Sequence, residues 1–120
     1  MQREQIEGKS LQILIGEQLS AVTFVQDYLQ LHFDGPCLTV FSHPVVRLGN
    51  QTFHGGKPGF RDALCNNIAK KVTEVRVAYG ESISIRFVDG STINIPLQDD
   101  SCLDGEAVNF DAGGNVWWSL

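Results

Sequence analysis

The sequence predicts one mainly β domain of the α+β class, spanning residues 1–120. Three observations predict it: 120 residues suffice for a single domain, apolar and polar side chains alternate in short segments, and one half repeats the pattern of the other. We expect two copies of an antiparallel β-meander to form one compact sheet or barrel-like domain, with one helix near residues 58–69 and a short helical turn near residues 10–15.

An internal repeat, residues 11–44 and 64–96, organises the chain. Its apolar positions correspond in pairs, namely Leu11 with Leu64, Ile15 with Ile68, Leu19 with Val72, Val22 with Val75, Leu29 with Ile83, Leu31 with Ile85 and Phe33 with Phe87. The spacing within the pairs grows slightly along the repeat. The extra residues fall in predicted turns, where insertions are tolerated.

Each copy of the repeat predicts three strands. In the middle strand of the first copy, Leu29, Leu31 and Phe33 alternate with polar residues, and a period of two is typical of a half-buried antiparallel strand. We expect flanking strands near residues 19–25 and 37–41, and near residues 72–79 and 91–96. Asp34-Gly35 and Asp89-Gly90 predict tight turns, because both residue types adopt positive φ.

A hairpin is expected after each meander, and a helix between the copies. Residues 45–48 and 51–54 form the first hairpin, and the C-terminal hairpin covers residues 106–120. Phe60, Leu64 and Ile68 are four residues apart, which places them on one face of a helix. Pro58 suits the first turn of that helix.

Composition and charge favour a cytoplasmic protein. The net charge of −5 repels the backbone of DNA or RNA, so no nucleic-acid partner is expected. No apolar run reaches the roughly 18 residues that a membrane helix needs, and the polar N-terminus lacks the apolar core of a signal peptide. An odd number of cysteines, 3, at wide spacing favours reduced thiols over a disulfide framework.

Three segments, residues 27–36, 59–64 and 113–118, resemble a family of short bacterial hypothetical proteins. The resemblance covers most of the chain, and it implies no activity because that family has none assigned. The pairing of two strand repeats in one domain is also loosely similar to small immunity-type proteins. That second resemblance implies a protein that inhibits another protein by binding it.

The segment before the predicted helix is the first candidate site, with His54, Gly55, Gly56, Lys57 and Arg61. Backbone amides beside a helix N-terminus suit an anion, and a lysine adds positive charge. The spacing lacks the P-loop pattern. The structural alternative is a flexible connector in which the glycines supply positive φ.

Two further candidate sites lie near the C-terminus. Asp99 and Asp100 begin an acidic loop that lacks EF-hand spacing, so it is either a solvated loop or a patch that faces a basic partner. Trp117 and Trp118 are adjacent and point to opposite faces of a strand. One joins the core, and the other is covered by a second apolar layer or contacts a partner.

Histidine and cysteine residues form no close motif. The candidates are His32, His43, His54, Cys37, Cys65 and Cys102. Zinc sites favour closely spaced pairs of such ligands, and no such pair is present. We therefore expect no metal, no cofactor and no catalytic residue, with the thiols in structural roles.

The sequence favours a non-catalytic protein-interaction module, of which an immunity-type inhibitor is one form. Its expected partner is another protein or a second copy of the chain in a homodimer. Two alternatives stay open. A small enzyme would pair one of the histidines with Asp27 or Asp62. A self-associating structural protein would satisfy the edges of its meanders in a symmetric dimer.

Overall fold

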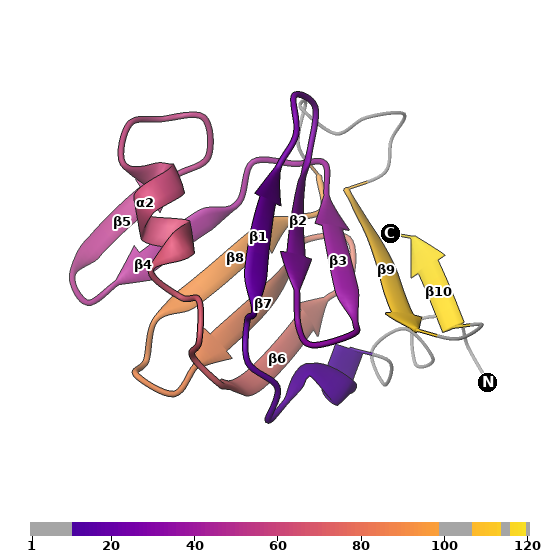
Figure 1. The fold of residues 1–120 in the computed structure, drawn as a ribbon. Helices are drawn as coiled ribbons and strands as arrows, with labels where there is room; N and C mark the ends of the chain where they lie inside the picture. Colours follow the sequence, from indigo (N-terminus) through magenta and orange to yellow (C-terminus); the bar gives the residue numbers. More distant parts are fainter. Residues whose placement is uncertain (1–10, 99–106, 114–115, 120) are drawn as a thin grey trace.

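The computed structural model describes residues 11–98, 107–113 and 116–119, with the backbone alone for residues 113 and 116–119. Figure 1 shows how the chain connects its elements. In chain order they are the 3-10 helix η1 (Gln12–Leu14), β1 (Ala21–Phe24), β2 (Leu29–His32), β3 (Cys37–Val40), β4 (Val45–Leu48), β5 (Gln51–His54), α2 (Phe60–Cys65), β6 (Val72–Ala78), β7 (Ser82–Phe87), β8 (Thr92–Pro96), β9 (Val108–Gly113) and β10 (Val116–Ser119). No helix among the described residues is long and apolar enough to cross a membrane.

Two five-stranded antiparallel sheets form the molecule. The first has the strand order β1-β2-β3-β9-β10, and the second β5-β4-β8-β7-β6. In Figure 1, β1, β2 and β3 pass in front of β6, β7 and β8. The prediction of a mainly β fold with two meanders, one helix and one short helical turn is confirmed. The sheets stay open and do not close into a barrel.

Each hairpin joins the meander of the other half of the chain. β4 and β5 follow the first meander, but β4 pairs with β8 of the second, and β9 pairs with β3 of the first. The two sheets therefore have the same arrangement. Each begins with a meander, β1-β2-β3 or β6-β7-β8, and continues with the hairpin of the other half of the chain, β9-β10 or β4-β5. Each half of the chain supplies strands to both sheets, while a common origin of the two halves stays a prediction.

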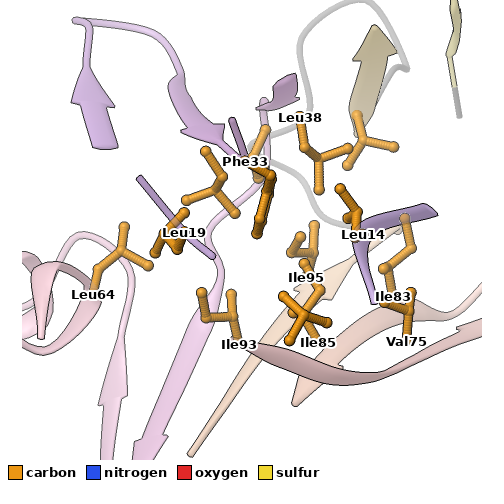
Figure 2. Close-up of a cluster of buried hydrophobic side chains, with 14 of the residues drawn as sticks. Leu14, Leu19, Phe33, Leu38, Leu64, Val75, Ile83, Ile85, Ile93 and Ile95 are labelled. Carbon is orange, nitrogen blue, oxygen red and sulfur yellow. The ribbon is translucent and has the colours of Figure 1, made fainter. Parts of the chain in front are cut away.

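The hydrophobic core lies between the two sheets. Leu31 of β2 and Ile83 and Ile85 of β7 are fully buried, as their alternation with polar residues predicts. Figure 2 shows Phe33 and Leu38 pointing toward side chains of the opposite sheet. Burial of one such side chain stabilises the folded state by about 1.5–3 kcal/mol, so this cluster holds the sheets together.

The two predicted Asp-Gly turns differ. In the first turn, both Asp34 and Gly35 have positive φ, 53° and 128°. In the second turn, Gly90 has positive φ, 89°, and Asp89 does not. Asp89 instead accepts a hydrogen bond from the backbone N–H of Ser91 and forms an ion pair of 2.6 Å with Lys70. Hydrogen bonds from Lys70 and Ser91 hold the pKa of Asp89 well below its usual range.

The predicted helix is shorter than its apolar spacing indicates. Gly59 precedes α2 with φ 87°, and the helix ends at Cys65. Phe60 and Leu64 are buried as expected, but Ile68 is 39% exposed. The expectation that Ile68 shares their face is wrong, because Ile68 lies beyond the end of the helix.

Candidate functional site: a cleft beside an exposed edge strand

The connector between β5 and α2 packs against the link between β3 and β4. The N–H of Gly55 donates to the carbonyl of Pro44 over 2.8 Å. A Cβ on Gly55 would lie 3.0 Å from Cα and Cβ of His43 and from the Pro44 carbonyl, so glycine is required by this close approach. Gly56 and Gly59 have φ of 80° and 87°, which glycine adopts without strain.

A cleft of about 330 Å³ opens beside this connector. Its walls come from residues 24–29 at the β1–β2 turn, residues 40–44 between β3 and β4, the glycines of the connector, and the start of α2. The cleft thus joins segments that are far apart in sequence. Its volume lies at the lower end of the range for small-ligand pockets.

One residue of the cleft wall carries a buried hydroxyl that makes no hydrogen bond among the described residues. Ser42 is 4% exposed, and among the described residues its Oγ makes no hydrogen bond. Most buried polar groups in proteins are satisfied, and an unsatisfied one costs about 1–3 kcal/mol. The unsatisfied Oγ is therefore a cost to the fold, and because the atom is buried, a group in the cleft reaches it only if neighbouring atoms move aside.

Aromatic rings and both signs of charge surround the cleft. The guanidinium of Arg61 lies 5.5 Å from the centre of the Phe24 ring, a cation–π contact. The rings of Tyr28 and Phe41 are tilted, with centroids 5.7 Å apart. Asp27 also lines the cleft. Such a lining suits a group with an apolar body and a polar end.

β1 leads directly into the cleft and lies at the edge of its sheet. Among the described residues β2 is the only strand that pairs with it, α2 contacts it, and most of its side chains are exposed. Phe24 is 37% exposed, and the next residue, Val25, is 41% exposed. Residues 18–26 carry no charge. Edge strands are usually protected by charged residues or proline, and β1 has neither.

The backbone of β1 offers hydrogen-bonding groups along this edge. Val25 and Tyr28 exchange two backbone hydrogen bonds at the turn. Along an antiparallel ladder, residue pairs that exchange backbone hydrogen bonds alternate with pairs that do not. The backbone N–H and C=O of Thr23, two residues before Val25, therefore point toward β2. The N–H and C=O groups of Val22 and Phe24 therefore point away from the sheet.

The corresponding edge of the second sheet is partly covered, from Val72 to Val75. Gly16 donates to the carbonyl of Val72, and the N–H of Val72 donates to Glu17. Farther along β6, the side-chain amide of Gln12 donates to the carbonyl of Val75 over 3.1 Å. Val75 corresponds to Val22 by register, so the two edges differ although their strands match.

The structure brings some of the predicted site residues together. Gly55, Gly56 and Arg61 line the cleft, and Lys57 lines an adjoining groove of about 440 Å³. His54 is exposed on β5, opposite Val45. An anion site at the N-terminus of α2 stays a prediction.

The structure does not place the predicted C-terminal site residues in this cleft. Asp99 and Asp100 lie outside the described residues. Trp117 and Trp118 belong to β10, where their backbones pair with Asp111 and Phe110. Trp118 and Phe53 hold equivalent positions in the two sheets. Trp118 of β10 pairs with Phe110 of β9, and Phe53 of β5 pairs in the same way with Val46 of β4.

The described thiols and histidines differ in their surroundings. Burial is the main reason that the pKa of the Cys37 thiol is raised, which disfavours the reactive thiolate. Cys65 is exposed. His32 lies 3.1 Å from the hydroxyl of Thr23. Across the described part of the chain, no three His, Cys, Asp or Glu side chains gather in a way that would hold a metal ion.

Sequence reasoning missed the edge of β1 and Ser42. The absence of charge from residue 18 to residue 26 was a usable signal for the edge. Ser42 offered no signal, because its burial depends on chain segments that meet only in the fold.

Comparison with known proteins provides no relative for this chain. No protein-family model, no curated protein and no solved structure matches it. The resemblance to short bacterial proteins therefore stays a prediction, and function has to be argued from the cleft and the edge strand.

Proposed function

We propose that the protein is a non-catalytic interaction module that binds an extended segment of a partner protein along the outer edge of β1. The observation that carries this proposal is the exposed, uncharged edge of β1, with the backbone groups of Val22 and Phe24 directed outward. A peptide that adds to such an edge gains main-chain hydrogen bonds, which supply affinity.

The cleft supplies the specificity in this proposal. It begins at Phe24, where β1 ends, so a side chain of the added segment can enter it. Phe24, Tyr28 and Phe41 offer apolar contact there, and Asp27 and Arg61 offer charged groups. Pockets for individual side chains are how strand-adding domains distinguish their partners.

The test uses a random dodecapeptide library displayed on phage, selected against the immobilised protein. Phe24→Pro removes an outward N–H and leaves the ladder to β2 in place. Val77→Pro is the matched control, since Val77 holds the corresponding position on β6. We expect selected peptides to bind the wild type and Val77→Pro but to lose binding to Phe24→Pro.

Two outcomes would count against the proposal. In the first, no peptide is enriched. In the second, the enriched peptides bind both proline variants equally well. Circular dichroism of each variant establishes that it is folded before its binding is compared.

A second candidate function follows from the side chains that share the cleft. Asp27 and His43 both line it, and Ser42 lies next to His43 in sequence. This is one of the histidine–carboxylate combinations that the enzyme hypothesis requires. However, an activated serine is hydrogen-bonded to its base, and Ser42 Oγ makes no such bond among the described residues.

A fluorophosphonate probe separates the two candidates. Such probes modify activated serines covalently. We expect no modification of Ser42, as judged by mass spectrometry of the intact protein. Labelling that is lost in Ser42→Ala would contradict the non-catalytic proposal and favour the enzyme.

A further inference from the structure

The outer face of the second sheet carries three arginines. In β7, the residues that alternate with buried Ile83 and Ile85 face away from the core, and Arg86 is one of them. Arg86 pairs in register with Thr92 of β8, and Thr92 pairs on its other side with Arg47 of β4. Arg76 of β6 lies in the next row, opposite Ser84. All three arginines are exposed.

Positive charge exceeds negative charge on this face. Glu74 pairs in register with Arg86 and forms an ion pair with Arg76. Among the described residues, neither Arg47 nor Arg86 forms an ion pair. A hollow of about 190 Å³ lies between Arg76 and Arg86, lined by these two residues and by Glu74, Ser84 and Thr92. The face is therefore locally basic in a chain whose net charge is −5.

We propose that this face docks an acidic, carboxylate-bearing segment of a partner protein. A guanidinium holds a carboxylate through two parallel hydrogen bonds. Arg86 can do so in the hollow, where the hydroxyls of Ser84 and Thr92 add donors. Arg47 lies two strands from Arg86, about 10 Å away, and takes a second carboxylate. The proposal does not depend on the edge of β1.

The composition of the face favours a protein segment over a nucleic acid. The rows across β6, β7, β8 and β4 contain Glu74, Arg86, Thr92 and Arg47 in one, and Arg76, Ser84, Asn94 and Val45 in the other. None of these residues is aromatic. Proteins that bind single strands use aromatic rings on which the bases stack, and these rows provide none.

The test measures binding of a fluorescent deca-glutamate peptide by polarisation at low salt. We expect Arg86→Gln and Arg47→Gln each to weaken binding by about threefold or more. Glu74→Gln should strengthen binding by a similar factor, because it removes the one carboxylate of the hollow. Arg61→Gln is the control, since it makes the same change of charge at an exposed arginine of α2, which lies against Phe24 of the other sheet.

Three outcomes would overturn the proposal. The peptide fails to bind the wild type; or Arg61→Gln weakens binding as much as Arg86→Gln does; or an oligothymidylate of equal length binds more tightly than the peptide, which would make a nucleic acid the favoured ligand. The opposite effects expected for Glu74→Gln and Arg86→Gln guard against misfolding, because a damaged fold does not bind more tightly.

Discussion

At the scale of single residues, two buried serine hydroxyls have different hydrogen bonding. Ser91 Oγ lies 2.7 Å from Asn67 Oδ1 and 2.6 Å from Asp89 Oδ1. Ser42 is equally buried, but its Oγ makes no hydrogen bond among the described residues. The first hydroxyl holds a turn together. The second is a cost to the fold.

Ser42→Ala is expected to leave the free energy of unfolding unchanged or raise it by up to about 1 kcal/mol, because it removes an unsatisfied buried group. Ser91→Ala is the matched control and should lower it by about 1 kcal/mol. Urea denaturation measures both. Equal destabilisation by the two substitutions would show that Ser42 has a partner in the folded protein.

Asp89 should make stability depend on pH. Its folded-state pKa is lowered chiefly by Lys70, so its contribution is present above the unfolded pKa and is lost as pH falls through the folded one. We expect the stability difference between wild type and Asp89→Asn to be constant down to about pH 5 and to shrink below about pH 4.

The magnitude of this effect is small because the pair is partly exposed. The Asp89 side chain is 46% exposed, so the difference should stay below about 1 kcal/mol. Lys70→Met should reduce the pH dependence, and Lys71→Met should not. If the difference in free energy of unfolding between wild type and Asp89→Asn stays constant into strong acid, the negative charge of Asp89 does not contribute to stability.

At the scale of elements, the sequence predicted the strands better than the helix. Alternation such as Leu29, Gln30, Leu31 has one interpretation, so β2 and β7 were located correctly. The spacing of Phe60, Leu64 and Ile68 also fits a longer helix. It ends at Cys65 because residues 66–70 turn back, with Ala69 donating to the carbonyl of Leu19. That contact is between distant segments, which local spacing does not predict.

Self-association is the prediction that belongs to β1 as an element. In the absence of a partner, a second copy offers the same edge in an antiparallel arrangement. We expect sedimentation equilibrium to detect a wild-type dimer at high concentration. Phe24→Pro should be monomeric and Val77→Pro dimeric. A monomeric wild type throughout would restrict the proposal to a different protein as partner.

At the scale of the whole molecule, the exchanged hairpins determine where the candidate site forms. The sequence indicated both meanders and both hairpins, but not which sheet each hairpin would join, because strand pairing depends on the complete fold. β4 pairs with β8 of the second meander and carries β5 with it into that sheet, and the link from β3 to β4 therefore crosses between the sheets. Ser42 and His43 lie on that link.

The candidate site was only partly predictable for the same reason. The glycine-rich connector was recognised from its composition, and the structure places Gly55, Gly56 and Arg61 in the cleft. The opposite wall, residues 24–29, has no motif that marks it. Its role depends on β1 being an edge strand with α2 beside it (Figure 1), which is a property of the assembled sheets.

Amide hydrogen exchange of the protein, with and without a selected peptide, tests the central claim most directly. If a partner segment adds to β1, exchange at Val22 and Phe24 slows when the peptide binds, because their outward N–H groups become hydrogen-bonded. Exchange at Val75 and Val77 of β6 stays unchanged. A bound peptide that leaves Val22 and Phe24 unprotected, or that protects β5 or β6 instead, would contradict the account.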